Sequence, residues 1–387
     1  MKNFLFTFVV PLLVLFLSQC ENNSSNLKDK KLLKSSESDV YLPEINFSKG
    51  FSLEKDSVWT ILKFRNPSNP EEIIASYYLI RQGEPRPSDV SKSKVLEIPV
   101  QKISCLSAPE IEALKLLNVE NALVGISSSK YVSDSLIIDK VKKKKIAELS
   151  VNGIVDKEKL IECMPNVLMI SWFQGTDLNE FQSTGICVLP NLDYLETHPL
   201  GRAEWLKLYG VLFEKEIESE KLFSSIQEKY QNLKKAIDSV VFKPKVISGK
   251  MLSGTWYVPG GKSYLANIIG DSGAEYVWSN NSDSGSIPLD IESVLYKGKD
   301  ADYWIIVAEI PDDKVYNVLQ NESPLYTEFD AFKEQKILFC NTINGQFFEK
   351  SPFEPHLVLA DFIHAFHSEL LKGYSPKFYK IIKQNYN

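Results

Sequence analysis

A long helical signal dominates the middle of this 387-residue chain. Apolar residues recur at the three- and four-residue spacing of a helix over residues 205–213 and again over 222–237. No glycine or proline interrupts residues 211–243. The acidic patch at 214–220 predicts a break between two helices, and the second, over roughly residues 218–239, would be about 33 Å long. A helix of that length can cross from one lobe of a protein to another.

Strand and helix signals alternate on both sides of this helical region. Before it, strand-like runs occupy residues 59–64, 76–80, 95–100, 103–105, 122–126, 167–171 and 186–189, with helical patterns at 109–117 and 157–163. After it, strands are expected at 246–249, 303–307 and 337–339, and helices at 263–269, 291–296 and 357–371. The alternation predicts an α/β protein with an N-terminal lobe over 46–215, a bridging helix over 216–240 and a C-terminal lobe over 241–387.

The composition excludes several classes of protein. Apolar residues make up 44% and charged residues 24%, which are values of a globular protein and not of a disordered chain. The formal net charge is −6. Because a protein that grips many phosphates is normally basic, we expect no nucleic-acid partner.

The N-terminus has the pattern of an export signal. One lysine precedes an apolar run over residues 4–17, which is short for a membrane span of about 20 residues. The run ends at Leu17-Ser-Gln-Cys20, which resembles a bacterial lipobox. Residues 1–20 are therefore expected to be a lipoprotein signal, Cys20 the lipidated residue, and residues 21–45 a flexible tether. The alternative is an uncleaved anchor in which Cys20 has no role, and either interpretation places the fold outside the cytoplasm.

The cysteines and histidines indicate no metal site. Four cysteines share no C-x-x-C spacing and could form two disulfides or remain as free buried thiols: Cys105, Cys163, Cys187 and Cys340. His364 and His367 stand three residues apart on one predicted helix face, but no matched carboxylate or thiol completes a site. We therefore expect no resident metal or cofactor.

Two further motifs have ordinary explanations. The stretch 254–263 resembles a phosphate-binding loop, but Trp256 occupies the position of a required glycine and Pro259 removes a backbone donor. Ser263 is expected to cap the helix that follows. The run Lys-Val-Lys-Lys-Lys-Lys at 140–145 is expected to be a solvated loop between a strand-like segment and a helix, with contact to anionic lipid as the alternative.

Three motifs in the same order resemble one known family. They are Pro199-Leu-Gly-Arg-Ala-Glu-Trp-Leu-Lys-Leu, Trp256-Tyr-Val-Pro-Gly-Gly-Lys-Ser-Tyr, and Glu354-Pro-His-Leu-Val-Leu-Ala-Asp followed by His364-Ala-Phe-His and Tyr379. They look like the substrate-binding lipoproteins of bacterial ABC transporters, in the group that binds cobalamin, haem and iron–siderophores. The resemblance covers roughly residues 51–382. It implies two Rossmann-like α/β lobes joined by a single long helix, with the ligand in the cleft between them.

The two halves of the chain repeat one short pattern. A glutamate opens a short helix before a buried strand in each half, Glu158 before residues 166–170 and Glu292 before residues 302–306. In the resembled family, one exposed carboxylate on each lobe docks into arginine pockets of the membrane permease, and Glu158 and Glu292 match those positions. Carboxylate–arginine pairs are strong and orient a docked surface. The alternative is that both are ordinary acids favoured at the start of a helix.

Ligand contacts are expected in loops at strand ends, where open α/β sheets bind ligands. The candidates are Ser107, Trp172, Phe173, Gln174, Trp256, Tyr257, Gly260, Gly261 and Phe347, with the loop 127–131 and Trp278 beside them. Aromatic side chains suit a large, flat, partly apolar ligand, and Gly260-Gly261 would let the backbone approach it. Each aromatic could instead pack in a core. Trp172 and Trp256 are preferred, because each stands where a strand gives way to a glycine-bearing loop.

The leading hypothesis is a lipid-anchored, monomeric solute-binding protein. It would capture an iron–siderophore, haem or cobalamin-like compound on the periplasmic side of a bacterial membrane and deliver it to an ABC permease. No chemical step is expected, since the sequence contains no nucleophile elbow, H-E-x-x-H or kinase motif. Two alternatives stay open: an extracytoplasmic enzyme on the same two-lobe scaffold, and a sensor or adhesin that would not need the paired glutamates.

Overall fold

The computed structural model describes residues 41–56, 58–151, 153–343 and 346–384. The expected signal peptide, Cys20 and most of the expected tether lie outside these residues. From Leu42 onward the described chain forms one compact unit. Among the described helices, none combines the length and the apolar character that a membrane span requires.

Two sheets form the N-terminal lobe. The first has the strand order β1–β2–β3–β4, with bounds Phe51–Asp56, Trp59–Asn66, Asn69–Arg81 and Val95–Ile98. The second is parallel and has the order β11–β10–β5–β6–β7, with bounds Cys187–Asn191, Val167–Ser171, Ile103–Cys105, Leu123–Ile126 and Ala147–Glu148. Its helices are α2 (Ala108–Leu116), α3 (Ser135–Lys142) and α4 (Lys157–Cys163), and a short hairpin joins β8 (Ser150–Val151) to β9 (Ile154–Val155).

A second parallel sheet organises the C-terminal lobe. Its order is β15–β12–β17–β18–β19, with bounds Glu275–Tyr276, Lys245–Ser248, Tyr303–Ala308, Ile337–Asn341 and Tyr379–Ile382, and β19 runs antiparallel to β18. A smaller antiparallel sheet contains β13 (Met251–Leu252), β14 (Thr255–Pro259) and β16 (Ser286–Leu289). The helices are α7 (Tyr264–Asp271), α8 (Ile291–Gly298), α9 (Val315–Glu322), α10 (Asp330–Lys333), α11 (Gln346–Lys350) and α12 (Pro355–Phe366). The predicted α/β class is confirmed.

Helix α3 occupies residues 135–142, which include the first three residues of the lysine run, in place of the strand-like segment and loop that we expected. The Asp134 carboxylate caps this helix by accepting hydrogen bonds from the backbone N–H groups of Leu136 at 2.8 Å and Ile137 at 3.2 Å. Ile137 then packs in the core of the N-terminal lobe. A short apolar run fits either a strand or a buried helical turn, and here the cap decides for the helix.

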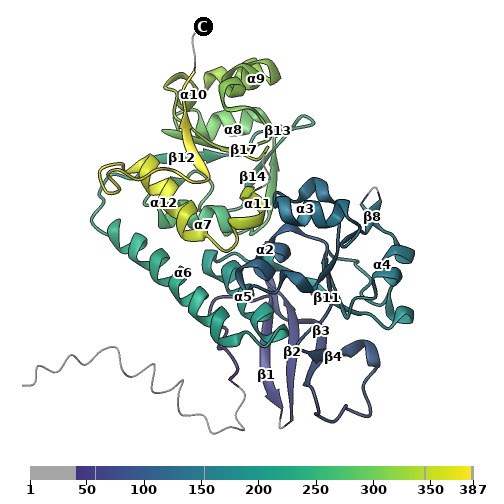
Figure 1. Cartoon of the computed structure of the whole chain (residues 1–387). Helices are drawn as coiled ribbons and strands as arrows, with labels where there is room; N and C mark the ends of the chain where they lie inside the picture. The colour runs from purple at the N-terminus through teal and green to yellow at the C-terminus, as the bar shows by residue number, and fades with distance from the viewer. Residues whose placement is uncertain (1–40, 57, 152, 344–345, 385–387) are drawn as a thin grey trace, which may run out of the picture. The chain divides into compact units, whose positions relative to one another are not determined.

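Helices α5 (Pro199–Leu212) and α6 (Glu216–Ala236) connect the lobes (Figure 1). Near the start of α6, Glu216 pairs with Arg81 of β3 at 2.5 Å. Near its end, the Tyr230 hydroxyl donates a hydrogen bond to Asp271 of α7 at 2.7 Å. Helix α6 is therefore held by one lobe at its start and by the other at its end.

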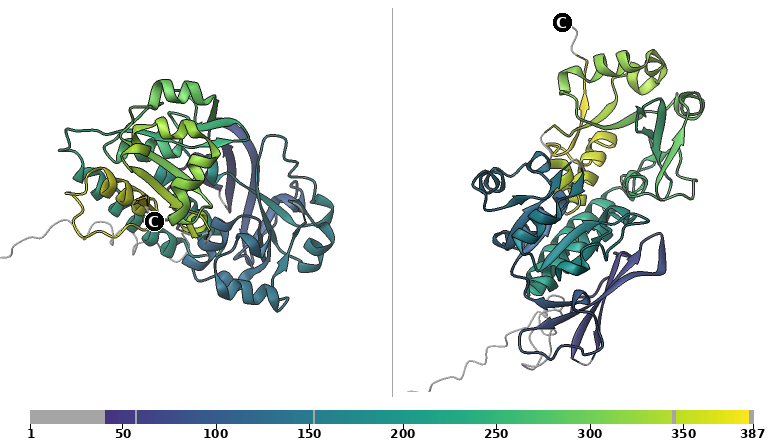
Figure 2. Two further views of the ribbon diagram at one scale, coloured as in Figure 1. Left: turned by 90° about the horizontal axis from the view of Figure 1, so that it is seen from above. Right: turned by 90° about the vertical axis from the view of Figure 1, so that its right-hand side faces the viewer.

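Helix α5 contributes to the hydrophobic cores of both lobes. Leu200 and Ala203 near its start pack in the core of the C-terminal lobe. Trp205 packs in the core of the N-terminal lobe, with its ring 5.2 Å from Phe51 of β1 and 6.1 Å from Phe64 of β2. Figure 2 shows this four-stranded sheet (purple) beside the bridging helices (teal). The sequence predicted a bridge of one helix, over residues 216–240, whereas α5 and α6 together connect the lobes.

Two buried carboxylates hold the segment by which the chain enters the fold. Glu204 of α5 accepts hydrogen bonds from the backbone N–H groups of residues 46–48, at 2.6 to 3.1 Å. Glu196 accepts them from Lys49 and Gly50 and from the Trp205 indole at 3.0 Å. Because unpaired buried backbone groups are costly, these acids fix residues 46–50 against the bridge.

A third buried carboxyl group, Glu110, joins helix α2 to strand β11. It accepts hydrogen bonds from the Ser107 backbone N–H at 3.1 Å, in a capping box, and from the Asn191 side chain at 2.9 Å. Burial raises the pKa of Glu110 to about 8, although both hydrogen bonds act in the opposite direction. Folding therefore favours the protonated carboxyl group at neutral pH.

We expect Glu110→Gln to flatten the pH dependence of stability. The unfolded carboxyl group has a pKa near 4.3, so between that pH and about 8 the folded protein keeps a proton that the unfolded chain releases. Stability then falls with rising pH by up to about 1.4 kcal/mol per pH unit. Glutamine retains the capping box and does not titrate. Urea unfolding from about pH 5 to about pH 8 measures the effect, with Glu97→Gln on the exposed surface as the control. Equal slopes in both variants would contradict this role.

Candidate ligand-binding site

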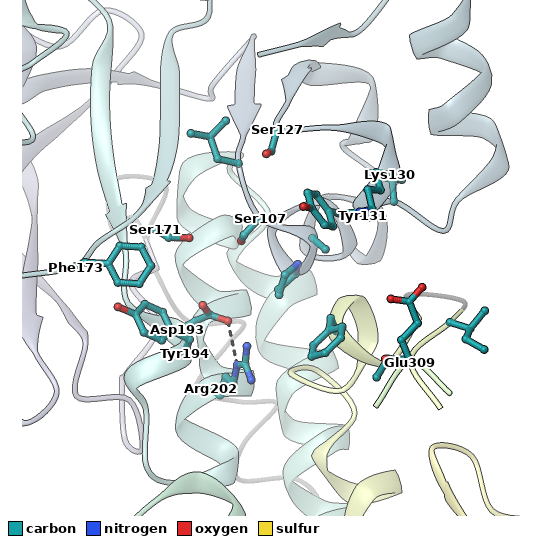
Figure 3. A pocket seen from close by; sticks show the side chains of 17 residues that line it. Ser107, Ser127, Lys130, Tyr131, Ser171, Phe173, Asp193, Tyr194, Arg202 and Glu309 are labelled. Atoms are coloured by element: carbon teal, nitrogen blue, oxygen red, sulfur yellow. Dashed lines mark hydrogen bonds and ion pairs between the residues drawn. The ribbon is translucent and has the colours of Figure 1, made fainter. Parts of the chain in front are cut away.

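A cavity of about 640 Å³ is lined by residues of both lobes. Its wall residues lie at the carboxyl ends of parallel strands: Ser107 follows β5, Ser127 follows β6, and Ser171 ends β10. From the C-terminal lobe, Glu309 follows β17 and Thr342 follows β18. Figure 3 shows the three serines and Glu309 around the cavity. This is the edge at which open α/β sheets bind ligands.

Four aromatic rings stand exposed around the cavity. The exposed fractions are 61% for Tyr131, 60% for Phe173, 53% for Phe348 and 38% for Tyr194. Phe173 and Tyr194 lie on one side with ring centroids 5.5 Å apart, and Tyr131 lies across from them (Figure 3). Clustered apolar surface that no core covers marks a binding site, because a ligand that covers it gains the free energy of burial.

Charged groups are placed between these rings. The Arg202 Nε of α5 donates a hydrogen bond to Asp193 at 3.1 Å, and the guanidinium lies 5.8 Å from the centre of the Tyr264 ring. Lys130 and Glu309 are exposed at the cavity and come from different lobes. Two cations and two anions among apolar rings suit a ligand that combines broad apolar faces with polar groups.

The turn that carries Tyr131 is held by carboxylates from both lobes. On its own lobe, Glu148 of β7 accepts hydrogen bonds from the Ser129 backbone N–H at 2.6 Å and hydroxyl at 2.7 Å, and the first of these chiefly lowers its pKa. From the other lobe, Glu349 of α11 accepts hydrogen bonds from both the backbone N–H and the hydroxyl of Ser133. Only 3% of Glu349 is exposed. The two walls of the cavity are therefore directly linked.

Some of the predicted ligand residues line the cavity and others do not. Ser107 and Phe173 line it, and so do three residues of the predicted loop 127–131. Trp172 is half-buried against the core of the N-terminal lobe, and its carbonyl accepts a hydrogen bond from Tyr194. Gln174 is exposed beyond the cavity. In this loop Phe173 is thus the aromatic residue that lines the cavity, and Trp172 packs the loop against the core of the N-terminal lobe.

The prediction that Trp256 contacts the ligand is wrong. Trp256 is fully buried, stacks on Trp304 with centroids 5.4 Å apart, and donates its indole N–H to the Ser248 carbonyl at 3.0 Å. Successive residues of a strand point to opposite faces, so Tyr257 points outward, with 44% exposed, and does not line the cavity. The glycines that flank this strand mark a hairpin and not a ligand loop.

The two adjacent glycines approach their own chain and not a ligand. A Cβ atom on Gly260 would lie 2.2 Å from the carbonyl oxygen of Asp283, and one on Gly261 would lie 2.4 Å from that of Asn281. Both positions require glycine, as expected. The reason is that the backbone of residues 278–285, and not a ligand, lies against them. The expected cap at Ser263 is confirmed, since its hydroxyl accepts a hydrogen bond from the Ala266 N–H at 3.2 Å.

The prediction for Phe347 misses the cavity by one residue. Its ring packs 5.7 Å from Phe378 and 5.5 Å from Tyr379, while the next residue, Phe348, lines the cavity. Trp278 is buried at a separate hollow. Sequence reasoning also missed Tyr194, Arg202, Glu309 and Thr342. The last two follow predicted strands, so the rule used for the other candidates could have found them.

Glu158 and Glu292 occupy matching positions on the two lobes. Each is the second residue of its helix, α4 or α8, and each helix is capped by an aspartate, Asp156 or Asp290. Both glutamates are exposed. Within the described part of the chain, no ion pair is formed by either carboxylate. The geometry leaves both available to a partner.

The four cysteines and His367 have structural environments. The cysteines at 105, 163, 187 and 340 are free thiols, so the two-disulfide alternative is not observed. Burial raises the pKa of Cys187 to about 12, which makes it unreactive. His367 is buried with its Nε2 3.2 Å from the Gly273 carbonyl oxygen. Over the described ranges, no group of three or more His, Cys, Asp and Glu side chains is arranged to hold a metal ion.

The chain matches the family model of the periplasmic binding protein over residues 103–342. An uncharacterised lipoprotein of Methanocaldococcus jannaschii is 25% identical over 302 residues, which is 74% of this chain and 70% of that protein. A second uncharacterised protein of the same organism is 24% identical over 198 residues, 50% of this chain and 59% of its own length.

Solved structures share the fold at low sequence identity. A periplasmic haem-binding protein of Pseudomonas aeruginosa has a TM-score of 0.57 at 15% identity, covering 74% of this chain and 100% of its own. An ABC-type Fe3+-hydroxamate transport protein of Saccharomonospora viridis has a TM-score of 0.52 at 18% identity, covering 71% and 94%. These likenesses show the fold alone. Because the family model spans the parallel strands of both lobes and the bridge between them, the chain belongs to the periplasmic binding protein family.

Proposed function

We propose that the chain captures a small molecule in the cavity between its lobes and delivers it to an ABC permease. The observation that carries the proposal is the ring of four exposed aromatics at the carboxyl ends of two parallel sheets. The proposal needs no chemical step. Binding free energy comes from covering the rings and from pairing the charged groups between them.

For the ligand, we propose an iron–siderophore, haem or cobalamin-like compound. A cavity of about 640 Å³ is in the range of small-molecule sites and admits most of such a ligand while leaving part of it exposed. The mixture of aromatic rings and charges suits a metal chelate with polar substituents. The solved structures of similar fold include proteins named for haem and for Fe3+-hydroxamate, which supports this class of ligand.

For the partner, we propose that Glu158 and Glu292 dock into basic pockets of the permease. They occupy the same position in equivalent helices of the two lobes, and both are exposed. Two such contacts, one on each lobe, would orient the cavity over the transport pathway. We also propose that the protein is a monomer. We propose further that lipid on Cys20 anchors it, and the name of the lipoprotein relative supports this anchor.

Removing an exposed cavity ring should weaken ligand binding. Phe173→Ala and Tyr131→Ala are each expected to lower affinity by about tenfold or more, because each removes an anchor that the ligand covers. Native mass spectrometry and an absorbance spectrum of protein from its own host identify the compound, and fluorescence titration with it gives the affinities. Tyr257→Ala is the matched control, since Tyr257 is a comparably exposed ring away from the cavity. Unchanged affinity in both cavity variants, or conversion of the compound to a product, would contradict the proposal.

Reversing both docking charges should stop delivery while leaving capture intact. The double variant Glu158→Arg/Glu292→Arg is expected to lower uptake of the compound in cells by at least about tenfold, because like charges then face each other at both contacts. Its affinity for the compound should equal that of the wild type. The control is Glu71→Arg/Glu369→Arg, which reverses one exposed acid on each lobe away from α4 and α8. Normal uptake by the first double variant would refute the docking role.

A further inference from the structure

A hollow lined by lysines adjoins helix α4. We call it the lysine hollow, with a volume of about 810 Å³ and five lysines at its rim: Lys102, Lys142, Lys144, Lys145 and Lys159. Its acidic members are Glu148 and Glu162, and its floor includes Val124, Val141 and Ile146. All five lysines are exposed. The hollow therefore concentrates positive charge on a chain whose net charge is −6.

The lysine run 140–145 divides between two surfaces. Lys140 donates a hydrogen bond to Asn121 at 3.1 Å, and Lys143 pairs with Asp139 at 2.7 Å, so both are used within their own lobe. The other three lysines of the run line the lysine hollow. Across the described residues, none of these three forms an ion pair. Within the run, Lys140 and Lys143 therefore have partners, whereas the three lysines that line the hollow are exposed to solvent.

The acids of the lysine hollow do not neutralise it. Glu148 accepts hydrogen bonds from Ser128 and Ser129, so its carboxylate is engaged by the cavity turn. Glu148 and Glu162 both carry negative charge, and Lys159 also pairs with Asp156 at 3.8 Å, but the five lysines outnumber these acids. A positive hollow of this size favours an anionic partner and repels a cationic one.

The end of helix α3 fixes the backbone at the rim of the lysine hollow. Lys144 has a φ of 56°, in the left-handed region that favours glycine after the end of a helix. Its N–H donates to the Val141 carbonyl at 2.8 Å, and the next N–H donates to Lys140 at 2.9 Å, which closes helix α3. A glycine would make the same turn without strain. Asn118, Met164 and Glu214 have the same conformation after helices α2, α4 and α5, so this is an ordinary helix end, and it places the Lys144 charge at the rim.

The lysine hollow adjoins the proposed docking surface. Helix α4 supplies Lys159 and Glu162 to the hollow, and Glu158 lies one turn before Glu162 on the same helix face. Under the proposed function, on which this inference rests, α4 faces the permease in its membrane. The lysine hollow beside it then faces the lipid that surrounds the permease.

We propose that the lysine hollow binds anionic phospholipid headgroups and turns the α4 surface toward the membrane. Lysines near an anionic bilayer each strengthen binding by about fivefold at physiological salt, and the attraction reaches about one Debye length. With the α4 surface held toward the membrane, the protein would need to rotate only within the plane of the membrane to align with the permease. The phosphates of the headgroups are the groups that the lysines would contact.

The test compares lysine reactivity on two membranes. The full chain is placed in nanodiscs of phosphatidylcholine, or of phosphatidylcholine with about one-third phosphatidylglycerol, and its lysines are acetylated and counted by mass spectrometry. We expect Lys102, Lys142, Lys144, Lys145 and Lys159 to react at least about fivefold more slowly on the anionic membrane. Lys243, an exposed lysine outside the hollow, should react equally on both. About 0.5 M salt should remove the difference.

Two variants of the lysine run 140–145 distinguish binding by the lysine hollow from a general effect of positive charge on the protein. In Lys142→Gln/Lys144→Gln/Lys145→Gln, protection of the remaining Lys102 and Lys159 should be lost. In Lys140→Gln/Lys143→Gln, which removes the lysines with partners, it should remain. Circular dichroism verifies that both variants fold.

Three results would overturn the proposal. One is equal reactivity on neutral and anionic membranes, and another is loss of protection in both variants. The third is the same protection on neutral membranes after adding inorganic phosphate alone, which would indicate a site for soluble anions. In all three cases the proposed function would stand if the cavity variants still lost ligand affinity and Glu158→Arg/Glu292→Arg still lost uptake, because those variants test the cavity and the paired glutamates and leave the lysine hollow unchanged.

Discussion

The burial of helix α5 is the constraint on which the arrangement of the cavity depends. Every residue of this helix is buried except Arg202, and Arg202 is the one that reaches the cavity. A Cβ atom on Gly210 would lie 2.1 Å from the Ser219 hydroxyl oxygen, so α5 and α6 can approach only through a glycine. Buried Lys207 pairs with Glu204 of α5 and with Glu220 of α6. The two lobes therefore share one rigid element, and the position of the cavity cation is set by it.

The sequence predicts much of the fold because the strands of parallel sheets are buried on both faces. Such strands appear as continuous apolar runs, and the expected bounds 167–171 are those of β10. The same reasoning failed at α3, where Ile137 and its neighbour form an apolar run too short to distinguish a strand from a helical turn. The break between α5 and α6 was predictable from the acidic patch, but the membership of α5 in two cores depends on packing between segments distant in sequence.

The candidate site was less predictable than the fold. The rule that ligands bind after parallel strands identified Ser107 and the loop with Tyr131. It failed between Phe347 and Phe348 of helix α11, because successive residues of a helix point in directions about 100° apart. It also failed at strand β14, where Trp256 points into the core and Tyr257 points to solvent away from the cavity. Asp193 and Arg202 contribute through a contact between a loop and a helix, which no local pattern records.

The link between Ser133 and Glu349 ties the two lobes together at the cavity, in addition to the bridging helices. Glu349 belongs to the C-terminal lobe by sequence, yet its carboxylate is bonded to the N-terminal lobe, and Phe353 a few residues later is packed in the core of that lobe. The stretch from 346 to 353 is therefore attached to both lobes, because Phe347 within it packs against Phe378 and Tyr379 of the C-terminal lobe. Any change in the separation of the lobes would therefore have to break the Ser133–Glu349 hydrogen bonds or unpack the Phe347 ring. Because buried hydrogen bonds are costly to break, this link holds the cavity at its present width on the side of Tyr131 and Phe348.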